Sequence, residues 1–254
     1  MTRVFRDTWL LLGRSVRSTL RNPTWVVIGL FQPVCYLLLF APLLQPLSQV
    51  PGFPPGGALT VFTPGLMVLM ALFGSISTSY GLLFELQTGV IERFRVTPVS
   101  RWALLLGLVL RDVLVVLAQM VLMALLALLM GARINVGGFL LALALLAMLG
   151  VCLSSCACAL ALALKDANSF AALLQTLITP VMVLSGILLP LTLAPPVLRT
   201  IGQFNPFAYA VVAARHLFLG NLTDVSVLQG FVLITGLMIL ALLWGVRSFK
   251  RATA

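Results

Sequence analysis

Long apolar stretches alternate along this chain with short segments that carry its polar and charged residues. A membrane-spanning helix needs about 20 mostly apolar residues. By this measure we predict six spans, at 25–45, 59–84, 113–130, 138–164, 169–189 and 228–246. The short connections 131–137 and 165–168 make the third, fourth and fifth spans antiparallel neighbours. The pattern predicts an all-α integral membrane protein, with residues 1–254 forming one domain.

The start of the third span depends on two charges inside an apolar run that begins at Trp102. A charged side chain at the bilayer centre costs about 2.5–3.5 kcal/mol on insertion scales. A span that begins after Asp112 keeps Arg111 and Asp112 at the membrane interface. Trp102 to Leu110 then form an interfacial elbow that leads into the span. The alternative is a functional pair of charges buried in the helix bundle.

The composition is that of a membrane protein, and it argues against a nucleic-acid partner and against a metal site. Hydrophobic residues make up 61% of the chain and charged residues 9%, with a mean hydropathy of +1.14. The net charge of +10 flanks the apolar segments instead of forming a patch, which argues against a nucleic-acid partner. The four cysteines lie in apolar runs and the single histidine is His216, so we predict packing cysteines and no metal site.

The positive charges predict the orientation. Six spans place both termini on the same side of the membrane, together with all but three of the 16 Lys and Arg residues. The other side holds Arg133, Arg199 and Arg215. Cytoplasmic loops of membrane proteins carry an excess of Lys and Arg. We therefore expect a multi-pass protein of the cell membrane, meaning an inner or plasma membrane, with both termini in the cytoplasm.

Residues 1–24 precede the first span and have the pattern of an amphipathic helix. At the helical period of about 100° per residue, five arginines fall within an arc of about 80°. Apolar side chains fill a second arc, and Asn22-Pro23 ends the helix before the first span. Such a helix lies flat on the membrane with its arginines toward anionic lipid headgroups. Two alternatives are a mitochondrial presequence and a simple topology anchor.

The common motifs of enzymes are missing from the sequence. It contains no G-x-x-x-x-G-K-[ST] phosphate-binding loop, no H-E-x-x-H zinc motif and no G-x-S-G nucleophile turn. In the predicted topology, the acidic residues all fall in loops or at interfaces. We therefore predict that this chain is not an enzyme and binds no cofactor itself.

Polar residues within the predicted spans are uncharged, so the chain lacks the midplane charges of ion-coupled carriers. Uncharged side chains of this kind suit an amphipathic or lipid-like substrate. The candidates for a substrate path are Gln119, Gln175, Thr176, Thr179 and Ser185. The alternative is that the serines and threonines only bond neighbouring helices.

A charged segment, ELQTGVIERFRVTPVSR at residues 85–101, interrupts the apolar pattern. As a helix it has one polar and one apolar face. The polar face carries Glu85, Thr88, Glu92 and Arg95, and the apolar face carries Leu86, Val90 and Phe94. Thr97 and Pro98 suit the N-cap and first position of a following helix. The segment predicts a short amphipathic helix and a sharp turn, with an ordinary solvated loop as the alternative.

The connection between the fifth and sixth spans is rich in helix breakers. Pro180 and Gly186 can break the fifth span, and the prolines at 190, 195 and 196 prevent a simple continuation. We predict a further helix over about 206–219, with its N-cap, first-position proline and terminating glycine at Asn205, Pro206 and Gly220. Arg215 and His216 are expected to be interface or capping groups of this helix.

Both segments resemble one family of membrane proteins. ELQTGVIERFRVTPVSR looks like the cytoplasmic signature of the ABC-2 type transporter permeases, most of all the daunorubicin-resistance type of drug exporter. SGILLPL at 185–191 and APPVLRTIGQFNPFAYAVVAAR at 194–215 resemble that family's fifth span, external re-entrant segment and external helix. The N-terminal amphipathic helix and the six spans agree, so the resemblance covers essentially the whole chain.

The resemblance implies a membrane subunit that pairs with a second copy of itself or a homologous permease. It implies two copies of a separate ABC ATPase subunit, which would hold ATP and Mg. Residues 85–101 would be a coupling helix in a groove on that ATPase, with contacts from Glu85, Thr88, Gly89, Glu92, Arg93, Arg95, Thr97 and Pro98. Residues 186–227 would be an external re-entrant region, with gate residues Gly186, Pro190, Asn205 and Pro206.

We therefore expect the permease subunit of an ATP-driven multidrug-type exporter that moves an amphipathic drug or lipid-like molecule. A subunit that exports a polysaccharide or lipid-linked glycan is the first alternative. The Leu, Ala and Val that dominate the spans favour a smaller, more apolar cargo. The second alternative is an ATP-independent channel or carrier.

Overall fold

The computed structural model describes residues 24–44, 46, 57–87, 101–188 and 191–252, together with Thr8, Trp9, Leu12, Gly13 and Arg17. The described residues form helices and their connections, which confirms the predicted all-α fold. The helices are α2 (Thr24–Leu44), α3 (Gly57–Gln87), α5 (Arg101–Leu129), α6 (Val136–Leu164), α7 (Ala167–Leu184), the 3-10 helix η2 (Leu191–Leu193), α8 (Pro196–Gln203), α9 (Pro206–Phe218) and α10 (Val225–Ala252).

Five of the described helices are long and apolar enough to cross a membrane. They are α3, α5, α6, α7 and α10, and each overlaps one of the predicted spans. Helix α2 coincides with the first predicted span, but its apolar stretch, Val27–Phe40, is shorter. The first of the six spans therefore stays a prediction.

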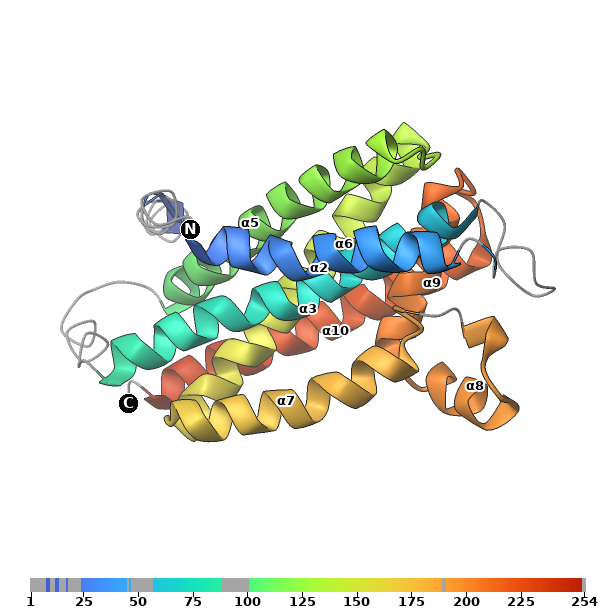
Figure 1. Cartoon of the computed structure of the whole chain (residues 1–254). Helices are drawn as coiled ribbons and strands as arrows, with labels where there is room; N and C mark the ends of the chain where they lie inside the picture. Colours follow the sequence, from blue (N-terminus) through green and yellow to red (C-terminus); the bar gives the residue numbers. More distant parts are fainter. Residues whose placement is uncertain are drawn as a thin grey trace.

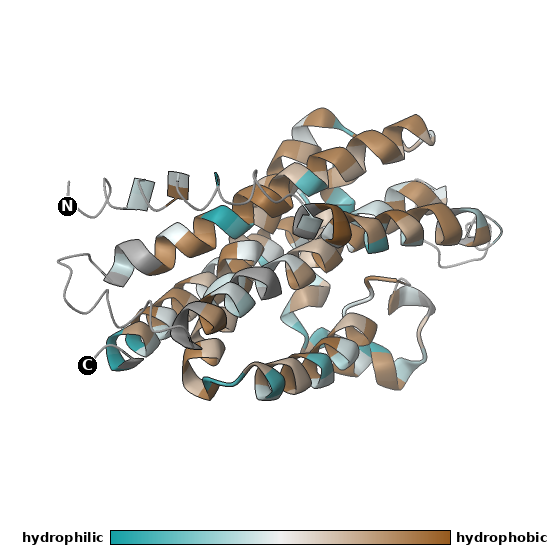
Figure 2. Ribbon diagram, turned by 60° about the vertical axis from the view of Figure 1, so that its left-hand side comes forward, coloured by the Kyte–Doolittle hydropathy of each residue, from teal (hydrophilic) through white to brown (hydrophobic). Residues whose placement is uncertain are grey.

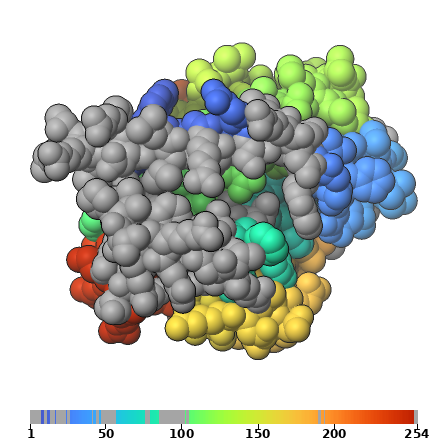
Figure 3. Space-filling model, turned by 90° about the vertical axis from the view of Figure 1, so that its left-hand side faces the viewer, coloured from blue at the N-terminus to red at the C-terminus, as the bar shows by residue number. Residues whose placement is uncertain are grey.

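The long helices run up and down beside one another (Figure 1). At one end α3, α6 and α10 end and α5 begins; we call it the Arg101 end. At the opposite end α3, α6 and α10 begin, and the short helices α8 and α9 gather there; we call it the α9 end. In Figure 2 the long helices are mostly brown, the colour of apolar residues, along their length. Figure 3 looks onto the Arg101 end, where α2, α7 and α10 reach the surface.

Helix α3 lies at the centre of the bundle, in contact with α2, α5, α6 and α9. The run from Leu66 to Leu69 is fully buried on all sides of the helix, which is the mark of a core helix. Two glycines allow close backbone contacts at the α9 end. A Cβ on Gly65 would overlap the carbonyl oxygen of Ile187, and one on Gly138 would overlap that of Leu217.

The predicted elbow before the third span is wrong. Helix α5 runs without a break from Arg101 to Leu129, so Trp102 to Leu110 are its first turns. Asp112 does not face the solvent of an interfacial elbow, because it is packed between helices with only 4% of its surface exposed. Ser154 Oγ donates a hydrogen bond of 2.9 Å to Asp112 Oδ2, and this partner lets the helix carry a carboxylate inside the bundle. The position of Asp112 agrees with the alternative interpretation, in which a charged residue is buried in the helix bundle.

The fifth span also differs from its prediction. Pro180 lies inside α7 without ending it, since a proline in a membrane helix removes only one backbone donor. The helix ends at Leu184, five residues before the predicted end, and Gly186 follows with a φ of 70°. That conformation favours glycine, so Gly186 is the breaker that the sequence indicated.

Candidate functional site

Most of the predicted coupling segment lies outside the described residues. This applies to Thr88, Gly89, Glu92, Arg93, Arg95, Thr97 and Pro98. Glu85 falls in the last turn of α3, where only its backbone is described. The N-terminal amphipathic helix predicted over 1–24 is likewise outside, apart from the few residues named above. The structure does show that α3 ends and α5 begins on either side of residues 88–100, at the Arg101 end.

The predicted substrate-path residues do not form one group. Gln119 is buried on α5 and faces Gly29 of α2, where a Cβ would lie 3.1 Å from its Nε2. Ser185 is buried at the end of α7, and its Oγ donates to Met182 O at 3.0 Å. The remaining three, Gln175, Thr176 and Thr179, share the exposed side of α7.

The threonines of α7 are bonded to their own helix. Thr176 Oγ1 donates to Ala172 O at 2.8 Å, and Thr179 Oγ1 donates to Gln175 O at 3.2 Å. Only 6% of this apolar helix is buried within the chain. An apolar helix that exposes hydroxyl and amide groups suits contact with a second protein or with an amphipathic molecule.

Both ends of α7 are attached to the bundle. At the Arg101 end, Phe170 is fully buried and packs edge-to-face on Tyr80 of α3, with ring centroids 5.4 Å apart. At the α9 end, Asn205 Nδ2 donates to Val181 O at 3.2 Å. The middle of α7 is therefore held in position although it buries little surface.

Asn205 and Pro206 begin α9 as predicted. Asn205 Oδ1 accepts a hydrogen bond of 3.0 Å from the backbone N–H of Phe207, and Pro206 occupies the first turn. Gly220 lies two residues after the end of α9 and has a φ of 85°. Of the predicted gate residues, Gly186, Asn205 and Pro206 thus lie at the α9 end, and Pro190 lies outside the described residues.

Arg215 has a role that sequence reasoning missed. It is 7% exposed, so it is neither at an interface nor a cap of its own helix. Its Nε donates to Val61 O of α3 at 2.9 Å, and its Nη2 donates to Gly186 O at 2.7 Å. Arg215 thereby connects α9 to α3 and to Gly186, which follows the end of α7. No local signal in the sequence points to this role, because both acceptors are backbone carbonyls in other parts of the chain.

His216, in the last turn of α9, and Asp224, just before α10, lie close together. His216 Nδ1 is 3.4 Å from Asp224 Oδ2, an ion-pair distance without a hydrogen bond. The backbone N–H of Ser226 donates to Asp224 Oδ1 at 2.8 Å, and this bond lowers the pKa of the Asp224 carboxyl below its ordinary value. Among the described residues, no three His, Cys, Asp or Glu side chains gather in a way that could hold a metal ion.

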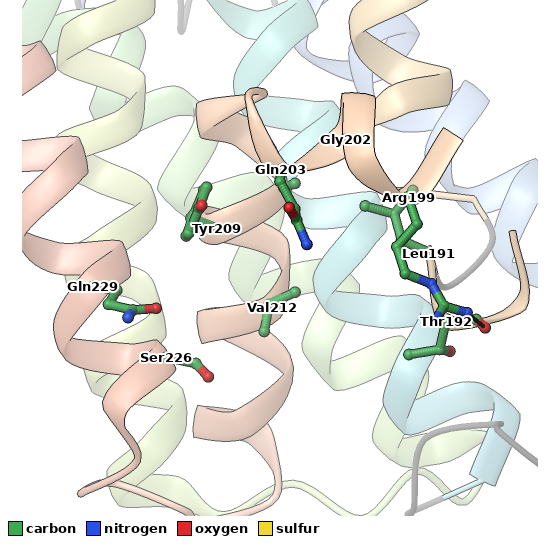
Figure 4. Close-up of a pocket in the computed structure, with 10 residues that line it drawn as sticks. Leu191, Thr192, Arg199, Gly202, Gln203, Tyr209, Val212, Ser226 and Gln229 are labelled. Atoms are coloured by element: carbon green, nitrogen blue, oxygen red, sulfur yellow. Dashed lines mark hydrogen bonds between the residues drawn. The ribbon is translucent and has the colours of Figure 1, made fainter. Parts of the chain in front are cut away.

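A cavity of about 360 Å³ adjoins the junction between η2, α8, α9 and α10 (Figure 4). Figure 4 shows Gln203 and Tyr209 on one side and Arg199 with Leu191 on the other. Ser226 and Gln229 of α10 complete the polar lining, while Val212 contributes apolar surface. The lining combines a cation, amides, hydroxyls and apolar groups, which suits an amphipathic molecule.

Comparison with known proteins agrees with this architecture. A family model described as ABC-2 type transporter matches residues 6–219. The putative transport permease ycf38 of Cyanophora paradoxa is 25% identical over 215 residues, which cover 84% of this chain and 74% of that protein. Its counterpart from Pyropia yezoensis is also 25% identical, over 82% of this chain and 72% of that protein.

A third relative carries a drug-resistance name. The daunorubicin resistance ABC transporter permease protein DrrB1 of Streptomyces coeruleorubidus is 26% identical over 221 residues, covering 83% of this chain and 74% of that protein. The resemblance predicted from residues 85–101 and 185–215 is confirmed. Since the matched region spans most of the sequence, the chain belongs to the ABC-2 type transporter family.

Proposed function

We propose that this permease is the membrane subunit of an ATP-driven exporter of amphipathic drug or lipid-like molecules. Two copies of a separate ABC ATPase subunit supply the energy and hold ATP and Mg. The chain has no phosphate-binding loop of its own, in agreement with that division of labour. The daunorubicin-resistance relative favours a drug-sized cargo.

The observation that carries this proposal is the open face of α7. Gln175, Thr176 and Thr179 are exposed there on a helix of which 6% is buried. In a bilayer, uncharged polar side chains such as the Gln175 amide commonly form hydrogen bonds to a neighbouring helix. We infer that α7 faces a second copy of this chain or a homologous permease, and that the substrate passes between the two.

The charge distribution supports the orientation. Lys165, Lys250 and Arg251 lie at the Arg101 end, where α6 and α10 finish. An excess of positive charge marks the cytoplasmic side. The Arg101 end and both termini would then be cytoplasmic, and residues 85–101 would meet the ATPase. The cavity beside Tyr209 and Arg199 would open on the outer side.

Reconstitution tests the proposal. The permease, with and without its partner ABC ATPase, is placed in proteoliposomes, and ATP-dependent movement of a fluorescent anthracycline is measured. We expect transport only with the ATPase, and none with an ATPase variant that binds ATP without hydrolysing it. Full transport by this chain alone would overturn the proposal and favour the ATP-independent channel or carrier. Movement of a lipid-linked glycan in place of the drug would favour the glycan exporter.

The coupling segment has its own test. Reversing the charges of Glu92 and Arg95 together should sharply lower substrate-stimulated ATP hydrolysis, because both side chains are expected on the face that meets the ATPase. The variant should still insert, since neither residue lies in a span. Reversal of Arg133, which lies at the other end of the bundle, is the control. Normal stimulation in the Glu92/Arg95 variant would show that this face does not dock.

A further inference from the structure

The proposed function leaves one buried ionisable residue without a role. Asp112 lies two turns into the apolar stretch Leu105–Leu129 of α5, which is long enough to cross a membrane, and it is 4% exposed. An ionisable group at such a place is costly, and where it occurs it generally serves a function together with a named partner. Its partner here is Ser154 of α6, whose Oγ donates 2.9 Å to Asp112 Oδ2. The other carboxylate oxygen lies 3.9 Å from Nη1 of the neighbouring Arg111.

Polar groups of three helices meet at the level of this bond. Cys158 follows Ser154 by one turn of α6, so the two side chains lie on the same side of that helix. Ser79 of α3 is also buried, and its Oγ lies 4.0 Å from Cys158 Sγ. Helix α6 therefore makes polar contacts with both α3 and α5. These are the two helices that flank residues 88–100.

Near this bond, α5 and α6 also approach each other through small apolar groups. Gly150 of α6 leaves room beside Val113 of α5, where a Cβ would lie 3.4 Å from Val113 Cγ2. Small apolar side chains let two helices approach closely but do not fix their relative height. A hydrogen bond is directional and short, so the bond from Ser154 to Asp112 sets the register of the pair.

We propose that Asp112 is a positioning residue that locks α5 to α6, so that movement delivered at residues 88–100 reaches α6. This inference rests on the proposed function. Helix α5 contains no proline and is continuous from Arg101 through Asp112, so a displacement of its first turn is carried to the bond without a proline hinge. Loss of the bond would let α5 slide past α6, and ATP would be hydrolysed with less transport.

Two neighbouring serines provide a matched test. Ser154 and Ser155 are both buried on α6, but Ser155 Oγ donates to Val151 O of its own helix at 2.7 Å. In proteoliposomes with the ATPase, we measure molecules exported per ATP hydrolysed. Ser154→Ala should lower this ratio by about three- to tenfold, the range expected for one interhelical hydrogen bond in a membrane. Ser155→Ala should leave it unchanged, and an equal loss in both variants would overturn the proposal.

Conservative variants separate the bond from packing and charge. Ser154→Thr keeps a hydroxyl and Ser154→Val removes it at nearly the same shape, so the ratio should be retained in the first and fall in the second. Asp112→Asn keeps an acceptor for Ser154 and should stay near the unmodified protein, whereas Asp112→Leu should not. If Asp112→Asn loses as much as Asp112→Leu, the hydrogen bond is not the link and the proposal fails.

A measurement without transport separates this inference from the proposed function. A double-mutant cycle on thermal unfolding of the solubilised permease compares Ser154→Ala and Asp112→Leu alone and together. Non-additive changes are expected if the two side chains are bonded. Additive changes would overturn the inference whatever the protein transports. Non-additive changes in a protein that shows no ATP-dependent export would count against the proposed function.

Discussion

Helices α3 and α7 have similar hydropathy and very different surroundings. The most apolar stretch of α3 has a mean hydropathy of 1.9 and that of α7 has 1.5. Yet 82% of the stretch in α3 is buried, and only 6% of the stretch in α7. Helix α3 is buried on all sides from Leu66 to Leu69 and packs against α2, α5, α6, α7 and α9, whereas α7 carries its amide and hydroxyl groups on the exposed side. Two helices of similar hydropathy thus have different positions. Helix α3 is packed in the core of the chain, and α7 lies at its surface.

The largest difference between the two helices should appear in a pair of leucines. Leu69 of α3 is 0% exposed and Leu177 of α7 is 51% exposed. Leu69→Ala should lower the free energy of unfolding by about 2–5 kcal/mol, because it leaves a cavity in a packed core. Leu177→Ala should change it by about 0.5 kcal/mol or less. Thermal unfolding in detergent measures both, and equal losses would show that α7 is as tightly packed as α3.

The next effect concerns the link between α3 and the end of α7. Arg215→Met leaves the carbonyls of Val61 and Gly186 without their donor, at a cost of about 1–3 kcal/mol for each buried group. Arg215→Lys should rescue only part of this, since one ammonium cannot reproduce the forked guanidinium. Arg199→Met, at an exposed arginine, is the control for loss of charge. If both arginine variants melt alike, Arg215 is not the link.

A smaller change in stability with a clear change in transport should mark the open face of α7. Thr176→Val and Thr179→Val together keep the shape of the helix, so unfolding should change by about 0.5 kcal/mol or less. Export should fall by about three- to tenfold if these hydroxyls meet the substrate or partner. Thr200→Val is matched to them, because Thr200 Oγ1 also donates to its own helix, at Pro196 O. Unchanged export in the α7 variant would mean that its face meets only lipid.

The smallest effect is at the first turn of α7. Asp166 caps this helix by accepting from the N–H of Ser169 at 2.7 Å, and hydrogen bonds from the Ser169 side chain and then its backbone lower the pKa of the carboxyl. The native pKa is below the unfolded one, so the stabilisation is complete above the ordinary aspartate pKa of about 3.9 and is lost as the pH falls through the native value. Protection of the Ser169 amide from hydrogen exchange should drop in that acid range. In Asp166→Asn the protection should not depend on pH there.

Several elements were predictable because local rules decide them. The apolar runs are as long as a bilayer is thick, so five of the predicted spans appear as long helices. Asn205, Pro206 and Gly220 act on the backbone within a few residues, so the bounds of α9 were predicted nearly to the residue. The family followed from residues 85–101 and 185–215, which are unlike ordinary spans.

The errors came from positions whose outcome depends on distant partners. Arg111 and Asp112 were predicted at an interface, because no local pattern reveals that Ser154, 42 residues later, donates a hydrogen bond to Asp112 inside the bundle. Arg215 read as a cap or interface group, because its acceptors Val61 and Gly186 come from two other parts of the chain. The separation of the predicted substrate-path residues within the chain was likewise not visible in the sequence, since Gln119 faces α2 and the threonines of α7 face outward; their role stays a prediction.

The sequence by itself determined the class of protein, the number of long apolar helices after residue 57 and the family. Those properties follow from segment length, local turn chemistry and motif. The tertiary structure alone decided which apolar helix is the core, which is open, and which charges are buried between helices. Hydropathy measures how strongly a segment favours an apolar environment over water. In a membrane, both the protein core and the lipid provide such an environment. Only the packing of one helix against another distinguishes them.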